Sequence, residues 1–193
     1  MAVNPRTNIV YVANDDGIYR STDFGDSYTD VGTGLQTGQF YNGFACSSTD
    51  SLIALGQSQD HIPGYRYLGG PVWDHNSAND EAGWTAINPS NDNIMYAVAR
   101  FGSSILRSTD RGASFSTVKV LNSTGAWNSP IVVANSNPNV LYMGDVQIHK
   151  STNSGGVWVT MNGGNMLDFN PVLSMAVSAT DANIVYAGTA PIS

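Results

Sequence analysis

Acidic and amide side chains stand close in sequence to aromatic residues at several places in this chain. Aromatic rings stack on the C–H faces of sugars, while carboxylates and amides bind sugar hydroxyl groups. A pair of carboxylates can also serve as acid and base in the cleavage of a glycosidic bond. The candidate ligand-binding residues are Asp16, Gln59, Asp60, His61, Tyr65, Asp80, Glu81, Trp84, Arg100, Trp127 and Asp145.

Several of these residues also have a structural explanation. Residues 15–17, Asp-Asp-Gly, suit a tight turn, Asp80 suits a solvated loop, and Trp84 can pack beneath a loop. His61 and His75 lack the repeated spacing of a zinc site. The carboxylates of residues 15–17 can bind calcium, but no further acidic ligand stands at a recognisable spacing. The sequence therefore predicts no cofactor.

The elements that position these residues are repeated strands. A short apolar strand ending in tyrosine recurs at residues 8–11, 93–96, 139–142 and 183–186. A second strand runs into Ser-Thr-Asp/Asn-x-Gly and an aromatic residue; we call this segment the box, and it occupies residues 21–28, 108–115 and 151–158. The period of roughly 40–50 residues is typical of propeller blades of four short strands.

The whole chain fits one architecture. No segment shows the sustained apolar spacing of a helix, so the sequence predicts an all-β propeller of four-stranded antiparallel blades, strands A to D, in a single domain of residues 1–193. The predicted parts are a partial blade of strands B, C and D at 1–37, blades at 38–82, 83–127 and 128–170, and a partial blade of strands A and B at 171–193. Because propellers close with 4–8 blades, these four to five blades favour completion by a second copy or a longer parent chain.

Strand order predicts where a ligand would bind. In antiparallel blades the B–C and D–A connections lie on one side, and the A–B turns and boxes lie on the other. Irregular loops carry most binding residues, so we expect the ligand on the B–C and D–A side. The loops concerned are residues 14–17, 32–39, 57–64, 74–82, 100–103, 121–128, 144–146 and 162–170.

The box resembles the Asp-box, or BNR, repeat, and the resemblance covers nearly the whole chain. The boxes beginning at Ser21 and Ser108 fit fully, whereas the third has Asn153 in place of aspartate. Such boxes occur in sialidases, xyloglucan-cleaving glycosidases, sortilin-type receptors and a photosystem II assembly factor. The box residues themselves have a structural role, because serine and aspartate can bond to the backbone of their own turn.

The resemblance also implies one catalytic residue. In the xyloglucan-cleaving members a catalytic aspartate follows a strand similar to residues 10–14, which implies Asp15 as a general base. Its partner acid lies in a second propeller in that family, which this chain lacks. Sialidases use three arginines, but Arg20 and Arg107 stand at the repeated position before the box, where Lys150 also stands, and this indicates a structural role.

Composition excludes some partners. Charged residues make up only 12% of the chain, with 8 Lys and Arg against 15 Asp and Glu. The absence of a basic stripe predicts no nucleic-acid partner, and the absence of an apolar run of about 18 residues predicts no membrane insertion. Few lysines with many Ser, Thr, Asn and Gly are typical of an extracellular or particle-surface protein, although no signal peptide precedes the first strand. Cys46 is alone, so no internal disulfide forms.

Three functions fit these observations. The sequence favours a non-catalytic recognition module that binds a glycan or a protein, because this function needs no specific catalytic set. The alternatives are a glycoside hydrolase, or a fragment of one, and a structural component of a larger surface or fibre assembly. The last is suggested by the two-stranded end of the pattern, since an open sheet edge invites pairing with another chain.

Overall fold

Short antiparallel strands make up most of the computed structural model of this chain. It describes residues 1–14, 17–32, 40, 42–58, 61–75, 83–121, 125–164 and 168–191, without the side chains of residues 61–64, 100 and 164. Two compact units are present, an N-terminal unit, Met1–Gly38, and a C-terminal unit, Gln39–Ser193.

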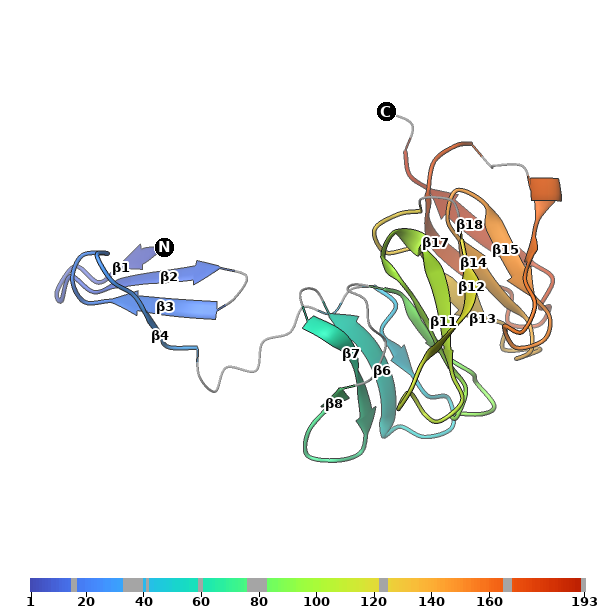
Figure 1. Cartoon of the computed structure of the whole chain (residues 1–193), viewed down its shortest axis with the longest axis horizontal. Helices are drawn as coiled ribbons and strands as arrows, with labels where there is room; N and C mark the ends of the chain where they lie inside the picture. Colours follow the sequence, from blue (N-terminus) through green and yellow to red (C-terminus); the bar gives the residue numbers. More distant parts are fainter. Residues whose placement is uncertain are drawn as a thin grey trace. The chain divides into compact units, whose positions relative to one another are not determined.

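The N-terminal unit is one antiparallel sheet (Figure 1). Its strands follow each other in chain order as β1 (Ala2–Val3), β2 (Val10–Asn14), β3 (Gly17–Ser21) and β4 (Thr29–Asp30). Tyr11, the tyrosine of the repeated strand, pairs with Arg20 of the strand that enters the box. Residues 1–37 were predicted as a partial blade of strands B, C and D, but β1 pairs with β2 and makes this sheet four-stranded.

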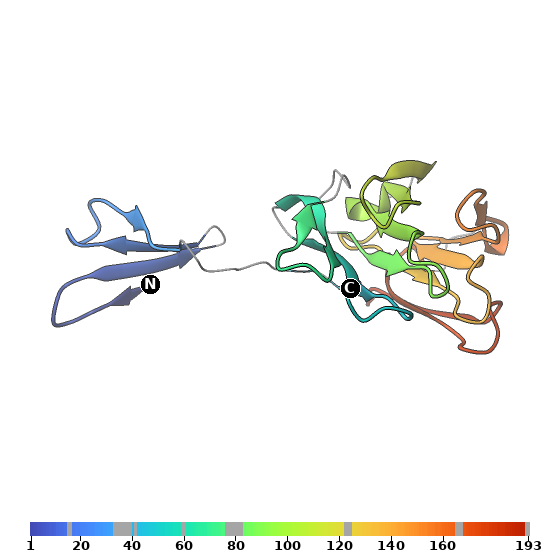
Figure 2. The ribbon, with the colours of Figure 1, turned by 90° about the horizontal axis from the view of Figure 1, so that it is seen from below.

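The C-terminal unit contains three four-stranded sheets and one two-stranded sheet (Figure 2). The first sheet comprises β5 (Ala45–Cys46), β6 (Ile53–Ser58), β7 (His61–Leu68) and β8 (Asp74–His75). The second comprises β9 (Thr85–Ile87), β10 (Met95–Val98), β11 (Ser104–Ser108) and β12 (Ser116–Val120). The third comprises β13 (Ile131–Val133), β14 (Leu141–Gly144), β15 (Ile148–Ser151) and β16 (Val159–Thr160), and the fourth comprises β17 (Val172–Val177) and β18 (Val185–Thr189). Within each sheet, every strand pairs antiparallel with the strand next to it in the chain. This pairing confirms the predicted fold class.

The core lies between successive sheets. Leu55 and Met95 meet between the first and second sheets, while Tyr96 and Leu141 meet between the second and third. Tyr142 belongs to the cluster between the third and fourth sheets. The repeated tyrosine is therefore a core residue in the second and third sheets, where its exposed fraction is 0% for Tyr96 and 1% for Tyr142.

The box closes the hairpin between the third and fourth strands of a sheet. In the second sheet, Ser108 Oγ accepts a hydrogen bond from Gly112 N at 2.8 Å and donates one to Asp110 Oδ1 at 2.7 Å. Asp110 Oδ1 also accepts a bond from Ser114 N at 2.9 Å. Gly112 has φ +77°, a conformation that glycine adopts without steric cost. These contacts confirm that the box stabilises its own turn, and the boxes at Ser21 and Ser151 repeat them.

One feature of the box was not predicted from the sequence. The residue before its glycine also has positive φ, at Phe24, Arg111 and Ser154.

The aromatic residue that closes the box is not equally buried in all three boxes. Trp158 and Phe115 pack against core clusters, whereas Tyr28 is 45% exposed. Packing between sheets therefore depends on more than the closing ring.

Candidate functional site

Two loops of the C-terminal unit meet on the side where the B–C and D–A connections lie. Phe101 belongs to the 3-10 turn η1 (Arg100–Gly102) between β10 and β11, and Trp127 precedes β13. Phe101 N donates to Trp127 O at 3.0 Å, and Gly125 N donates to Phe101 O at 2.7 Å. These two backbone bonds fix the B–C loop of the second sheet against the D–A loop that leads to the third.

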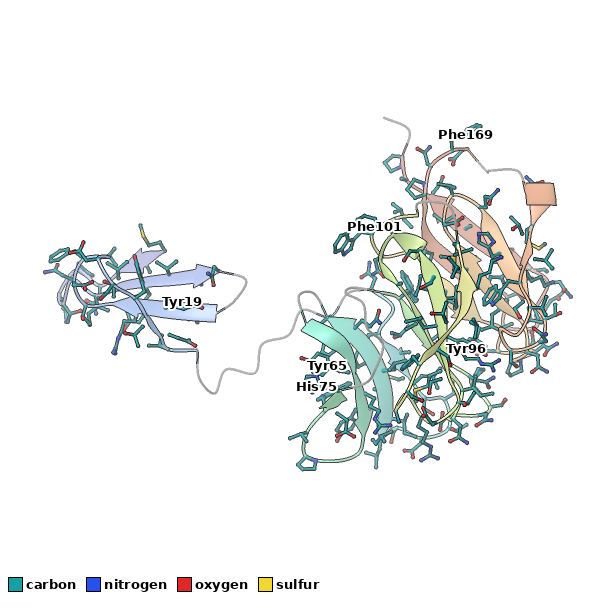
Figure 3. All side chains as sticks on the ribbon, in the orientation of Figure 1. Tyr19, Tyr65, His75, Tyr96, Phe101 and Phe169 are labelled. Carbon is teal, nitrogen blue, oxygen red and sulfur yellow. The ribbon has the colours of Figure 1, made fainter. Side chains whose placement is uncertain are left out.

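The Phe101 and Trp127 rings form an edge-to-face pair in these loops. Their centroids are 4.7 Å apart and their planes are at 88°. Phe101 has φ +58°, which costs a non-glycine residue on the order of 1 kcal/mol, yet the residue is 44% exposed. Figure 3 shows Phe101 at the margin of the C-terminal unit and Tyr96 among its strands. Strained residues of this kind cluster at ligand sites.

Sequence reasoning placed Trp127 in a ligand loop but missed Phe101. The available signal was an aromatic residue inside the predicted B–C loop 100–103. Its partner could not be identified from sequence, because the contact joins loops of two different sheets.

Polar atoms beside this aromatic pair lack partners in the structure. Trp127 Nε1 and Asn128 Oδ1 are buried without a hydrogen bond in the part of the chain that the structure describes. Asn128 Nδ2 donates to Asn42 O at 2.9 Å, across 86 residues of sequence. Because an unpaired buried polar group costs folding free energy, such groups call for an explanation.

Three more buried polar atoms without a partner among the described residues lie at the end of β6. Gln57 is 2% exposed and Ser58 is 0% exposed, and neither the Gln57 amide nor the Ser58 hydroxyl has a hydrogen-bond partner among the described residues. A Cβ on Gly83 would lie 2.1 Å from Gln57 Oε1 and 1.6 Å from Val98 O. The backbone that leads into β9 is therefore closely packed against these two strand ends.

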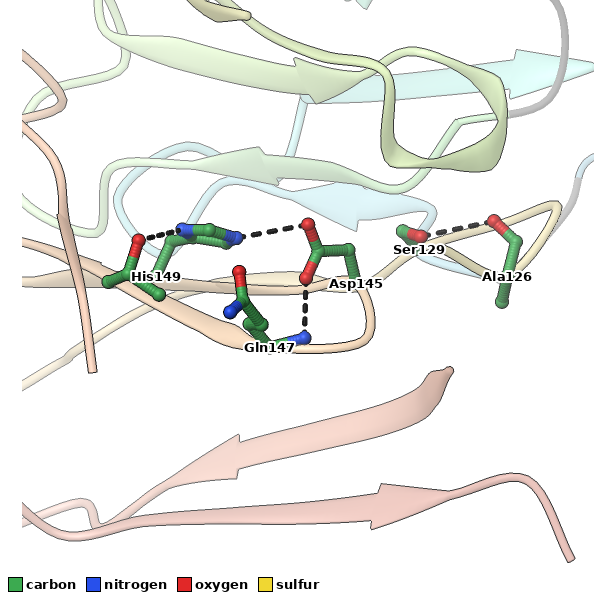
Figure 4. Close-up of polar contacts among 6 residues, drawn as sticks. Ala126, Ser129, Asp145, Gln147 and His149 are labelled. Atoms are coloured by element: carbon green, nitrogen blue, oxygen red, sulfur yellow. Dashed lines mark hydrogen bonds and ion pairs between the residues drawn. The ribbon is translucent and has the colours of Figure 1, made fainter. Parts of the chain in front are cut away.

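Asp145, a predicted ligand-binding residue, is fully buried. Its Oδ2 lies 3.0 Å from His149 Nε2, and its Oδ1 accepts a bond from Gln147 N at 2.5 Å (Figure 4). His149 Nδ1 lies 3.2 Å from Thr160 Oγ1, which connects the pair to β16. A Cβ on Gly125 would lie 3.1 Å from Asp145 Cα, so the loop that carries Trp127 rests on Asp145.

Trp84 and Tyr65 have mainly packing contacts. The Trp84 ring covers Gly43, where a Cβ would lie 2.2 Å from Trp84 Cγ, and the residue packs against the core of the second and third sheets. Tyr65 lies on β7, its ring centroid 4.7 Å from that of His75 and 5.9 Å from that of Phe40. Figure 3 shows Tyr65 and His75 together, apart from Phe101.

The other predicted site residues fall outside the described structure. Six of them lie entirely outside the described residues, and for two more the backbone is described without the side chain. These residues are Asp15, Asp16, Gln59, Asp60, Asp80 and Glu81, with the side chains of His61 and Arg100. Their roles stay predictions from the sequence.

Neither metal ligation nor a membrane span is indicated by the described residues. No three His, Cys, Asp or Glu side chains among them gather into a group that could hold a metal ion. No described helix has the length and hydropathy needed to cross a bilayer.

Comparison with solved structures identifies propeller enzymes as similar. An ancestral GH74 enzyme superposes with a TM-score of 0.61 at 22% identity, over 96% of this chain and 26% of its own. The GH74 enzyme of Niastella koreensis gives a TM-score of 0.60 at 22% identity, over 90% of this chain and 25% of its own. The GH74 xyloglucanase of Xanthomonas campestris gives 0.60 at 17% identity, over 79% and 28%.

This likeness establishes the fold. The chain spans roughly a quarter of the length of these three enzymes. No protein-family model and no curated protein sequence matches it. The strand order of the sheets and the structural likeness together show a β-propeller architecture of about four to five blades.

Proposed function

We propose that this chain is a non-catalytic recognition module of the Asp-box propeller type, and that its B–C and D–A loops bind a glycan. The observation that carries the proposal is the Phe101–Trp127 pair, which backbone bonds between the two loops hold with Phe101 44% exposed. The assignment to the Asp-box type is supported by the three hairpins in which serine, aspartate or asparagine, and glycine make the same bonds.

The chemistry of the pair suits a sugar. The exposed phenylalanine ring can stack on the C–H face of a pyranose. The backbone bonds between the two loops hold both residues in place before binding. A preorganised site loses less conformational entropy when the ligand binds, so this geometry favours recognition. Glycan recognition also fits the extracellular or particle-surface location that we propose for the protein.

Catalysis is less well supported than binding. Asp145, against which Gly125 of the D–A loop packs, has its carboxylate oxygens occupied by His149 and by Gln147 N. The specific observation in favour of an enzyme is the likeness to three GH74 enzymes, one of them a xyloglucanase. A glycoside hydrolase, or a fragment of one with Asp15 as general base, is therefore our second candidate.

Calorimetric titration with xyloglucan and cellulose oligosaccharides tests the first proposal, with a reducing-sugar assay on the same samples. We expect binding without turnover, and at least a tenfold loss of affinity in Phe101→Asn, because asparagine tolerates positive φ but has no ring. Phe24→Asn is the matched control, since Phe24 also has positive φ and lies in a box turn. Release of reducing ends that Asp15→Ala abolishes would favour the enzyme instead.

A further inference from the structure

The dipeptide Asn-Gly occurs twice in this chain, at residues 42–43 and 162–163. Asparagine is a chemically labile residue, and it is most labile before glycine, because the missing Cβ leaves the next backbone nitrogen accessible. Both asparagines are exposed, so contact with water does not distinguish them. The two dipeptides differ instead in how the surrounding structure holds their backbone.

The backbone of Asn42 and Gly43 is held by three neighbouring residues. Asn42 O accepts a hydrogen bond from Asn128 Nδ2 at 2.9 Å, and Gly43 O accepts one from Thr85 N at 2.9 Å. The ring of Trp84 covers Gly43, where a Cβ would lie 2.2 Å from Trp84 Cγ. A change of backbone conformation at this dipeptide would therefore break two hydrogen bonds and displace a packed ring.

Asn162 and Gly163 lie in a turn at the surface. They begin the 3-10 turn η2 (Asn162–Gly164), just after the outer strand β16. Asn162 has φ +55° and Gly163 has φ +63°, the left-handed pair that Asn-Gly favours in tight turns. Gly163 is exposed, whereas Gly43 is half-buried. Because turns at strand ends open locally at a small cost in free energy, the dipeptide in η2 can reach other backbone conformations.

We propose that Asn162 is a site of spontaneous deamidation in the folded protein, and that Asn42 is protected from the same reaction. The backbone nitrogen of Gly163 attacks Cγ of Asn162, and a new C–N bond forms while the bond from Cγ to Nδ2 breaks. The proton of the attacking N–H leaves with Nδ2 as ammonia, and a five-membered succinimide remains. Water then opens this ring at either carbonyl to give aspartate or isoaspartate, with no oxidation or reduction.

Both products change the connection between β16 and β17. Each adds a negative charge to a chain whose net charge is already −7. Isoaspartate also carries the main chain through Cβ, which lengthens the backbone of the turn. A preparation of this protein therefore becomes heterogeneous in charge and in the shape of this connection as it ages.

Peptide mapping of the full chain during incubation in mildly alkaline buffer tests the proposal. Trypsin cuts after Arg20, Arg66 and Lys150, so the two asparagines fall in separate peptides, and fragmentation mass spectrometry identifies the modified residue. We expect Asn162 to deamidate at least tenfold faster than Asn42 in the folded chain. In concentrated urea the two rates should be similar, because both asparagines precede glycine and no fold restrains either of them.

The variant Asn128→Ala tests the cause of the protection. It removes the hydrogen bond to Asn42 O, so we expect faster deamidation of Asn42 and an unchanged rate at Asn162. Asn135→Ala, at an exposed position between β13 and β14, is the matched control and should leave both rates unchanged. Far-ultraviolet circular dichroism shows whether each variant is folded.

Three results with the wild-type chain would overturn the proposal. These are equal rates at the two asparagines of the folded chain, a faster reaction at Asn42, and an Asn162 that reacts in urea but not in the folded chain. An Asn42 rate that Asn128→Ala leaves unchanged would contradict the assigned protection. If Asn128→Ala does not fold, the comparison of folded and urea-treated wild type decides.

Discussion

The guanidinium of Arg107 donates a hydrogen bond to the backbone carbonyl of Ser154, 2.9 Å away and 47 residues further along the chain. Arg66 makes the same kind of contact with Arg111 O, at 3.4 Å. Both acceptor residues have positive φ in their boxes. The left-handed residue of the box thus presents its carbonyl to a cation of the preceding sheet, which joins consecutive sheets.

This relationship predicts that Arg107 stabilises the C-terminal unit. We expect Arg107→Met, which retains the aliphatic part of the side chain, to lower the free energy of unfolding by about 1–2 kcal/mol, because a half-buried charged hydrogen bond is lost. Urea denaturation measures the change. Arg6→Met removes the same charge from an exposed position and should cost no more than about 0.5 kcal/mol. Equal losses in both variants would contradict a role for the contact with Ser154.

Two equivalent tyrosines should respond oppositely to loss of their hydroxyl groups. Tyr142 Oη donates to Ala182 O at 2.9 Å, whereas Tyr96 Oη is buried without a partner at hydrogen-bonding distance in the described structure. Burial raises the pKa of Tyr96 to about 12, with smaller opposing effects from the Arg107 charge and from the nearby Ser154 side chain, whose hydroxyl donates its hydrogen bond to Asn139 Oδ1 at 2.7 Å.

We therefore expect Tyr142→Phe to lose about 1 kcal/mol of unfolding free energy and Tyr96→Phe to lose none or to gain up to about 1 kcal/mol. The same urea titration measures both variants. A comparable loss in Tyr96→Phe would show that its hydroxyl does make a stabilising bond in solution.

Much of the strand pattern could be predicted from sequence, and the predictions that failed concern single strands. The predicted loops 100–103 and 162–170 end just before β11, at Ser104–Ser108, and β17, at Val172–Val177. The predicted loop 32–39 places the start of the next strand near residue 40, but β5 is only Ala45–Cys46. A Cβ on Gly56 would meet the Phe40 and Phe44 rings within 2.8 Å, so these aromatic residues cover β6, and Phe40 itself makes an isolated bridge with Ser58.

The candidate site was less predictable because its contacts are nonlocal. Loop membership of Trp127 and Asp145 follows from the repeat, but burial of Asp145 depends on His149 in the next strand and on Gly125 in another loop. The presence of Asn153 instead of aspartate in the third box is easier to explain. In the other boxes, the second carboxylate oxygen accepts a hydroxyl bond from Ser27 or Ser114, whereas the third has Val157 at that position. The single amide oxygen of Asn153 is therefore sufficient to accept the bonds from Ser151 Oγ and Val157 N.

The box carboxylates should make stability depend on acidic pH. Hydrogen bonds from the side chain and backbone of Ser114, and from Ser108, lower the pKa of Asp110 to about 2, and bonds from Ser27 and Ser21 lower the pKa of Asp23. A carboxylate with a lowered pKa in the folded state stabilises fully above its unfolded pKa, near 4 for aspartate. This contribution is lost as the pH falls through the folded pKa.

We expect the difference in unfolding free energy between wild type and Asp110→Asn to be largest above about pH 5. It should shrink as the pH is lowered toward about 2. Carboxyl chemical shifts measured by NMR over the same range should give a low pKa for Asp110, and Ser114→Ala should raise it. A pKa that Ser114→Ala leaves unchanged would contradict the assigned cause.

Gly83 should be the least replaceable position beside the candidate site. A Cβ there would lie 1.6 Å from Val98 O and 2.1 Å from Gln57 Oε1, and backbone atoms cannot yield as a flexible side chain can. We expect Gly83→Ala to destabilise the protein by about 3 kcal/mol or more, at the upper end of overpacking effects. Gly70→Ala is the matched control, because the nearest atom to its Cβ, Val72 O, is 3.9 Å away. Thermal unfolding of the two variants measures the contrast, and a similar melting temperature for both would show that the strand ends around Gln57 are more loosely packed than the structure indicates.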